Sequence, residues 1–191
     1  MIGSLLEEGK FSFHRGSLKG TLNAFMITFA VLGLDQLTKM IVERWAPYPG
    51  YTVVVVPWFN VFRLSFIHNR GAAFGMLTGY RWLFVVVAVV VSAFFVWIIV
   101  TSRSIHDRFT GGLILGGALG NMIDRVFTQT GVVDFIDVGF YSYRWPAFNV
   151  ADMALTVGMC WLIWYLSFEK KPEPIQTERS EEFTHEKEIQ K

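Results

Sequence analysis

The stretch LFVVVAVVVSAFFVWIIV, residues 83–100, decides the fold class of this 191-residue chain. Its 18 consecutive residues include no charged side chain, and Ser92 is the only polar one. At about 1.5 Å per residue, a helix of this length crosses most of the hydrocarbon core of a bilayer. Valine favours strands in water, but in lipid every backbone amide needs an internal partner, which favours a helix. The stretch therefore predicts a transmembrane helix.

Three further apolar segments are long enough to span a membrane, at roughly 22–42, 109–127 and 148–168. Unlike 83–100, each contains polar residues gathered toward one of its ends. If the chain alternates across the membrane, these three ends lie at the same face, so the sequence predicts one polar site at one membrane surface. The polar residues are Asp35, Gln36, Thr38 and Lys39 in the first segment, Asn121, Asp124 and Arg125 in the third, and Asn149 and Asp152 in the fourth.

The connection between the first two spans, about residues 46–78, is long for a loop without structure of its own. Tyr51–Val56 and Phe62–Phe66 are rich in Val, Tyr and Phe and are bounded by Pro and Gly, which is typical of short strands. The predicted fold is therefore an all-α integral membrane protein with four transmembrane helices and a small extramembrane β-element between helices 1 and 2.

Charge divides the chain into three parts. Of 33 charged residues, 12 fall in 169–191, which predicts a solvated, disordered tail, and 1–20 is predicted to be an N-terminal extension before a membrane domain over 21–168. Lys and Arg number 7 on the side of the termini and 5 opposite, which favours cytoplasmic termini. A net charge of +1 without basic clusters argues against nucleic-acid binding. The four histidines lack ligand spacing, so no metal site is predicted.

Several polar and glycine positions have structural interpretations. Asp35 and Lys39, spaced i and i+4, are predicted to form an ion pair whose side chains extend to the interface. A stripe of glycines at four-residue spacing predicts close approach of a neighbouring helix. Asp124 continues this stripe and is followed by Arg125, and the spacing of this pair fits a link between helix ends at least as well as a catalytic role. The glycines are Gly112, Gly116 and Gly120.

Three acids near the last span leave two interpretations open. Asp134 and Asp137 lie in an apolar segment, and Asp152 follows Asn149. Two acids that approach each other can share a proton, and such a pair can activate water and protonate a carbonyl, as in aspartic proteases. Alternatively, Asp134 caps a helix or pairs with an arginine, and Asp152 pairs with Lys39. Spacing alone does not separate the two.

Taken together, five sequence blocks resemble the lipoprotein signal peptidases (signal peptidase II), which are bacterial inner-membrane aspartic peptidases. The blocks follow the family's order and cover about residues 30–160, although each alone is weakly specific. They are DQLTK at 35–39, NRGAAFG at 69–75, GGALGNMIDR at 116–125, VVDFI at 132–136 and FNVAD at 148–152.

The resemblance implies roles for the matching residues. Asp134 and Asp152 match the catalytic dyad, and the strands at about 46–78 match a periplasmic β-cradle, which implies that both termini are cytoplasmic. The remaining matched residues are expected to support the site or the helix ends: Asp35, Lys39, Asn69, Asn121, Asp124, Arg125 and Asn149.

The resemblance also implies partners. The expected substrate is a diacylglyceryl-modified prolipoprotein in the membrane lipid, cleaved before its lipidated lipobox cysteine by a monomeric enzyme without a cofactor. Cyclic peptides of the globomycin type are the implied inhibitors. The alternative from another class is a small proton-coupled transporter that uses the same intramembrane acids. That class predicts ionisable residues spread through the membrane depth, whereas here they cluster at one end.

Overall fold

A computed structural model describes residues 17–71 and 76–168 of the chain. The predicted N-terminal extension, except for 17–20, and the predicted tail at 169–191 lie outside the described residues. So do residues 72–75 of the second sequence block.

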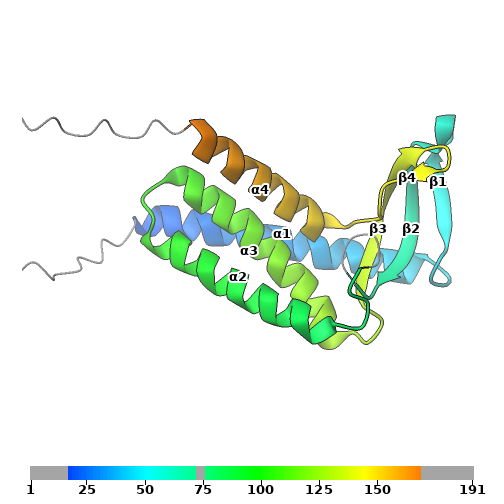
Figure 1. The fold of residues 1–191 in the computed structure, drawn as a ribbon, viewed down its shortest axis with the longest axis horizontal. Coiled ribbons are helices and arrows are strands. Elements are labelled where there is room, and N and C mark those ends of the chain that lie inside the picture. The colour runs from blue at the N-terminus through cyan, green and yellow to red at the C-terminus, as the bar shows by residue number, and fades with distance from the viewer. Residues whose placement is uncertain (1–16, 72–75, 169–191) are drawn as a thin grey trace, which may run out of the picture.

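Four helices form the main body, and their positions confirm the four helical segments predicted from the sequence. Three of them, α1, α2 and α4, are long and apolar enough to cross a membrane, whereas α3 does not meet this criterion. Helix α3 packs against all three other helices, so its glycines and charged residues face protein (Figure 1). That α3 is a fourth span stays a prediction. The helices are α1 Leu18–Trp45, α2 Arg81–Thr101, α3 Ile105–Phe127 and α4 Val150–Phe168.

A four-stranded antiparallel sheet with strand order β1-β2-β3-β4 lies at one end of the helices. The two strands predicted between the first two helices are confirmed as β1 and β2. The prediction that the whole β-element lies there was wrong, because β3 and β4 come from the connection between α3 and α4. The strands are β1 Thr52–Val56, β2 Phe62–Asn69, β3 Val132–Phe140 and β4 Tyr143–Arg144, with a 3-10 turn at Trp58–Asn60.

The physical reason for this error is the environment of β3. Residues of β3 are buried on both faces, so its sequence shows a nearly continuous apolar run rather than the alternation that marks a half-exposed strand. Its partner is distant in sequence, since Asp134 lies opposite Ile67 of β2 and Val132 opposite Asn69. Strand pairing therefore brings the fourth sequence block, with Asp134, beside the start of the second.

A small apolar cluster fixes the sheet against the helix ends. Val42 and Ala46, at the end of α1, pack with Phe66 of β2 and with Val133 and Phe135 of β3. Figure 1 shows the strands running across the helix axes at this end, while the start of α1 and the end of α4 lie at the opposite end. Because Val133 and Phe135 flank Asp134, the cluster holds this acid beside the helix ends.

The glycine stripe on α3 is confirmed as a close contact between helices. A Cβ atom at Gly112 would lie 2.7 Å from the backbone oxygen of Ala24, and one at Gly116 would lie 2.8 Å from Cβ of Val31. Both neighbours belong to α1, so the absence of a side chain on α3 allows the two backbones to approach.

We expect Gly116→Leu to destabilise the protein by more than about 2 kcal/mol, because the new side chain overpacks the contact with α1. Gly33→Leu is the matched control, since a Cβ at Gly33 meets nothing within 4 Å. The measurement is the melting temperature in detergent. A Gly116→Leu variant that melts with the control would contradict the packing role.

Candidate active site

The start of α4 is built by a reciprocal pair of hydrogen bonds between Asn149 and Asp152. The backbone N–H of Asp152 donates to Oδ1 of Asn149 over 2.9 Å, and the backbone N–H of Asn149 donates to Oδ2 of Asp152 over 3.2 Å. This is a capping box, in which the N-cap and N3 side chains satisfy each other's amides. The fifth sequence block thus positions its carboxylate by starting a helix.

Asn149 also contacts Asp134, the second acid of the site. Its Nδ2 donates to Oδ1 of Asp134 over 2.7 Å, and Nδ2 of Asn69 donates to Oδ2 of the same carboxyl over 3.0 Å. Asn149 is fully buried, so its amide orientation is fixed by these contacts. One asparagine therefore contacts both Asp134 and Asp152.

A second asparagine completes the link. Nδ2 of Asn121 donates to Oδ1 of Asp152 over 2.7 Å, while its Oδ1 accepts from Nδ2 of Asn149 over 3.2 Å. The same Oδ1 accepts from Nζ of Lys39 over 3.3 Å. Asn121 thereby connects Asp152 and Asn149 to Lys39, which belongs to a neighbouring group of charged residues.

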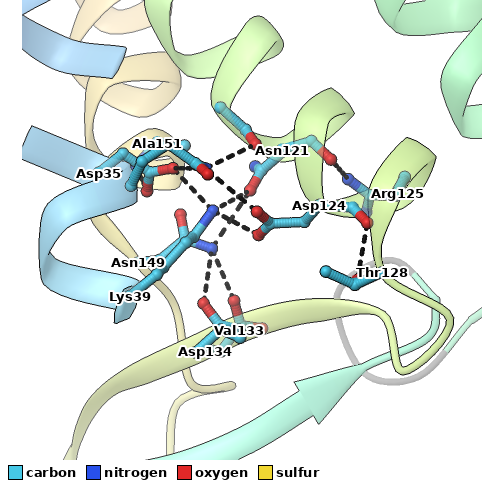
Figure 2. A network of polar contacts seen from close by, with 12 residues as sticks. Asp35, Lys39, Asn121, Asp124, Arg125, Thr128, Val133, Asp134, Asn149 and Ala151 are labelled. Carbon is cyan, nitrogen blue, oxygen red and sulfur yellow. Dashed lines mark hydrogen bonds and ion pairs between the residues drawn. The ribbon is translucent and has the colours of Figure 1, made fainter. Parts of the chain in front are cut away.

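That ionic group is a buried triad. Nζ of Lys39 lies 2.7 Å from carboxylate oxygens of both Asp35 and Asp124, and Nε2 of Gln36 donates to Asp124 over 3.1 Å. Oδ1 of Asp35 also accepts from the backbone N–H of Ala151 over 2.9 Å, in the first turn of α4. Figure 2 shows how Asp35, Lys39 and Asp124 meet between the helices.

The structure corrects one prediction about Asp35 and Lys39 and agrees with the one about Asp124. Asp35 and Lys39 do form an ion pair, but they are 0% and 3% exposed, so the prediction that they extend to the interface was wrong. The reason is tertiary, because Asp124 and the start of α4 supply partners that the sequence of the first helix does not show. Asp124 links α3 to α1, as predicted.

Arg125 makes its contacts at the end of α3 through neutral partners. Its Nη1 donates to the backbone oxygen of Asn121 and its Nη2 to that of Gly71, each over 3.2 Å. Its guanidinium lies 4.9 Å from the ring centroid of Phe84. Among the described residues it has no ion pair with a carboxylate. It connects Gly71 to the end of α3 through hydrogen bonds to backbone carbonyl oxygens.

Asp134 and Asp152, the two acids that Asn149 contacts, line a cavity of about 710 Å³. Most of its apolar lining residues come from α4 and the segment that precedes it. The cavity thus combines two carboxyl groups and other polar side chains with a largely apolar lining. Its residues are Asn69, Gly71, Asn121, Arg125, Val132, Asp134, Val138, Trp145, Pro146, Ala147, Phe148, Asp152, Met153, Leu155, Thr156 and Val157.

Asp134 has a shifted proton affinity. Burial, and next the charge of Asp152, raise the pKa of Asp134 to about 7, although the amides of Asn69 and Asn149 act in the opposite direction. Asp134 therefore keeps its proton at pH values where an exposed aspartic acid has lost it.

Asp137 has a different environment. Its Oδ1 lies 2.6 Å from Nη2 of Arg144, and Ser65 donates to its Oδ2 over 3.3 Å. It does not line the cavity. The arginine pairing left open for Asp134 is thus made by Asp137, and Asp152 pairs with asparagines rather than with Lys39.

The sequence placed Gln36 among the polar residues of the predicted site without giving it a role, and it did not indicate Arg81. Gln36 contacts both Asp35 and Asp124, and Arg81 donates through Nη2 to the backbone oxygen of Val126 over 2.8 Å at the end of α3. Gln36 belongs to the first sequence block, and this position could have indicated a role in the site. Arg81 belongs to none of the five blocks, so the sequence gave no indication of its contact with α3. Within 17–71 and 76–168, no group of three or more potential metal ligands comes together.

Fold and site together define a helical membrane protein with a carboxyl pair in a cavity at one end of the bundle. The sequence model of the signal peptidase II family matches residues 27–168. The chain therefore belongs to the signal peptidase II family and is a membrane peptidase.

Individual relatives agree with this membership. The lipoprotein signal peptidase of Geobacillus thermodenitrificans is 43% identical over 154 residues, which cover 78% of this chain and 92% of the relative. That of Anoxybacillus flavithermus is 39% identical and covers 80% and 90%. Two solved structures of bacterial membrane enzymes are 30% and 31% identical, with TM-scores of 0.72 and 0.70. They cover 85% and 82% of this chain and 99% of their own chains.

Proposed function

We propose that this protein is an aspartic endopeptidase that cleaves diacylglyceryl-modified prolipoproteins immediately before the lipidated cysteine, with Asp134 and Asp152 as the catalytic pair. Removal of signal peptides from prolipoproteins is the activity that family membership supports. The observation that carries the aspartic mechanism is that both acids line one cavity and share Asn149 as a hydrogen-bond partner.

The environments of the two acids suggest separate roles. Asp134 retains a proton near neutral pH and donates it to the scissile carbonyl oxygen. Asp152 occupies the N3 position of α4, where the helix dipole favours a negative charge, and accepts a proton from the attacking water. When the tetrahedral intermediate collapses, the C–N bond breaks, Asp152 passes the proton taken from water to the leaving amine of the cysteine, and a hydroxyl of the intermediate returns a proton to Asp134.

The cavity also fits the substrate class. Its apolar side, with Met153, Leu155 and Val157 of α4, suits the hydrophobic end of a signal peptide, and its polar side suits an unwound backbone. Arg125 and the asparagines Asn69 and Asn121 are proposed to hold that backbone and the carboxyl groups. Cyclic peptides of the globomycin type are proposed to occupy the same cavity, and the enzyme is proposed to act as a monomer.

The proposed location is the bacterial inner membrane, with the site at the periplasmic face and the termini in the cytoplasm. Two features support this arrangement. The start of α1 and the end of α4 lie together, opposite the sheet, and the exposed Trp45 and Trp82 lie at the sheet end of α1 and α2, where interfacial tryptophans are expected.

A direct test uses purified protein in detergent and a diacylglyceryl-modified precursor, without added cofactor or energy source. We expect cleavage before the modified cysteine, and much slower cleavage of the same precursor without the lipid. Mass spectrometry of the products identifies the bond. Cleavage at another bond, or no preference for the lipidated form, would contradict the proposal.

The raised pKa of Asp134 predicts a pH dependence. We expect kcat/KM to fall tenfold per pH unit above about pH 7, because Asp134 then loses the proton that it must donate. Between about pH 4 and 7 the folded state holds this proton while the unfolded state does not, so Asp134 makes the protein less stable as pH rises. The measurement is the melting temperature of the parent minus that of Asp134→Asn across this range. A difference that grows in favour of the parent with pH would contradict the shift.

A further inference from the structure

A second cavity, of about 590 Å³, lies beside the first at the same end of the bundle. Its wall is formed by the end of β2, the start of α2, the end of α3 and the segment at 129–131. Asn69 and Arg125 line both cavities, whereas Asp134 and Asp152 line only the first. The second cavity therefore adjoins the first but contains neither of the two acids.

Charge distinguishes this cavity from the first. Arg70, Arg81 and Arg125 line it, and none of its lining residues is acidic. In the described part of the chain, none of the three arginines forms an ion pair with a carboxylate. Three like charges around one cavity repel one another, so an anion bound between them would lower their electrostatic energy.

The hydrogen bonds of these arginines orient the guanidinium groups without neutralising them. Arg81 donates to the backbone oxygens of Arg125 and Val126, and Nε of Arg70 donates to the backbone oxygen of Thr130 over 3.4 Å. Carbonyl partners fix position but carry no net charge. Arg125 also interacts electrostatically with Asp152, Asp134 and Asp124, so the unbalanced positive charge comes mainly from Arg70 and Arg81. These two side chains are held in place by neutral partners, as a preorganised anion site requires.

A phosphate group fits this chemistry best. The planar guanidinium donates two parallel hydrogen bonds that match phosphate oxygens, and Gln129 adds a neutral side chain that can donate to the wall. The cavity also lies at the depth of lipid headgroups, because the exposed Trp82 begins α2 beside it and Arg81 lies 5.3 Å from its ring centroid. We propose that this cavity binds one phosphate group, supplied by a phospholipid headgroup or by a free phosphate ion.

The test measures binding by the full-length protein in a neutral detergent, with calorimetric titration of three probes. Dihexanoyl-phosphatidylglycerol carries phosphate and short acyl chains, inorganic phosphate carries the anion alone, and dihexanoylglycerol carries the chains alone. We expect saturable one-to-one binding of a phosphate-bearing probe and none of dihexanoylglycerol. Tighter binding of phosphatidylglycerol than of inorganic phosphate would identify a headgroup as the source, and equal binding would identify a free ion.

Arg70→Gln is the principal variant, because Arg70 is exposed and its replacement leaves the helices intact. We expect about a tenfold weaker affinity for the phosphate-bearing probe, as for loss of one hydrogen bond to a charged group. Gln129→Glu, which adds a carboxylate to the wall, should weaken binding by at least as much. Arg44→Gln is the matched control, since Arg44 is exposed in the last turn of α1 and lines neither cavity.

Three results would overturn the proposal. These are the absence of one-to-one binding by any phosphate-bearing probe, equal binding of dihexanoylglycerol, and equal losses in Arg70→Gln and Arg44→Gln. The last result would show attraction by overall charge rather than a site. Melting temperatures measured alongside confirm that each variant is folded. Because the readout is binding, failure of the proposed peptidase mechanism would leave it unaffected.

Discussion

We expect Asp134→Asn and Asp152→Asn each to lower the single-turnover rate of precursor cleavage by at least about a thousandfold, in line with the loss of a general acid or base. An amide keeps the shape of the carboxyl group and can accept one of its two hydrogen bonds from the neighbouring N–H donors, but it cannot exchange the proton. Binding of the lipidated precursor and the melting temperature should change little. The measurement is single-turnover cleavage of a diacylglyceryl precursor, with melting followed in the same detergent.

Asp137→Asn is the control that separates catalysis from structure. Asp137 is as buried as a catalytic acid but pairs with Arg144 and lies outside the cavity, so its loss should lower the melting temperature and leave most of the activity. A fully active Asp134→Asn or Asp152→Asn would rule out the pair. A stable but inactive Asp137→Asn would show that the wrong acid of β3 was chosen.

Lys39→Met is expected to have the largest effect on stability. Lys39 neutralises two buried carboxylates, and its removal leaves Asp35 and Asp124 without a positive partner. Removing one member of a buried ion pair typically costs about 3–5 kcal/mol. Melting in detergent should therefore fall sharply, and the capping contact between Asp35 and the start of α4 should weaken with it.

Two further variants give this prediction its controls. Lys19→Met removes the same charge from an exposed position on α1 and should leave melting unchanged. Lys39→Met combined with Asp35→Asn and Asp124→Asn removes the uncompensated charge and should recover part of the loss. If Lys39→Met melts like Lys19→Met, the triad contributes little to stability. If the triple variant recovers nothing, the lost packing of Lys39 rather than charge explains the effect.

The sequence contained most of the helical fold. Segments 22–42, 83–100, 109–127 and 148–168 correspond to the four helices. For the three that are long and apolar enough to span, the reason is that a single segment in lipid can satisfy its backbone groups only as a helix. The clustering of polar residues at segment ends also predicted correctly which helix ends meet. Such features are local, since they depend on the composition and order of neighbouring residues.

Pairings between distant residues were decided by the tertiary structure. Asp35 could be paired with Lys39 from their spacing, but its burial depends on Asp124 and on the backbone of Ala151, which lie 89 and 116 positions away. Likewise, the sequence left open an arginine partner for Asp134 and gave no partner for Asp137. The antiparallel turn between β3 and β4 gave that partner to Asp137.

The sequence by itself thus determined the helices, the polar end of the bundle and the acids that collect there. Only the tertiary structure decided that β3 joins the sheet of β1 and β2, that Asn149 contacts both Asp134 and Asp152, and that three arginines surround a second cavity. The physical reason is the distance along the chain between the interacting residues. Apolar runs and capping pairs act between residues near in the chain, whereas proton affinity and charge balance depend on groups that only folding brings within a few ångströms.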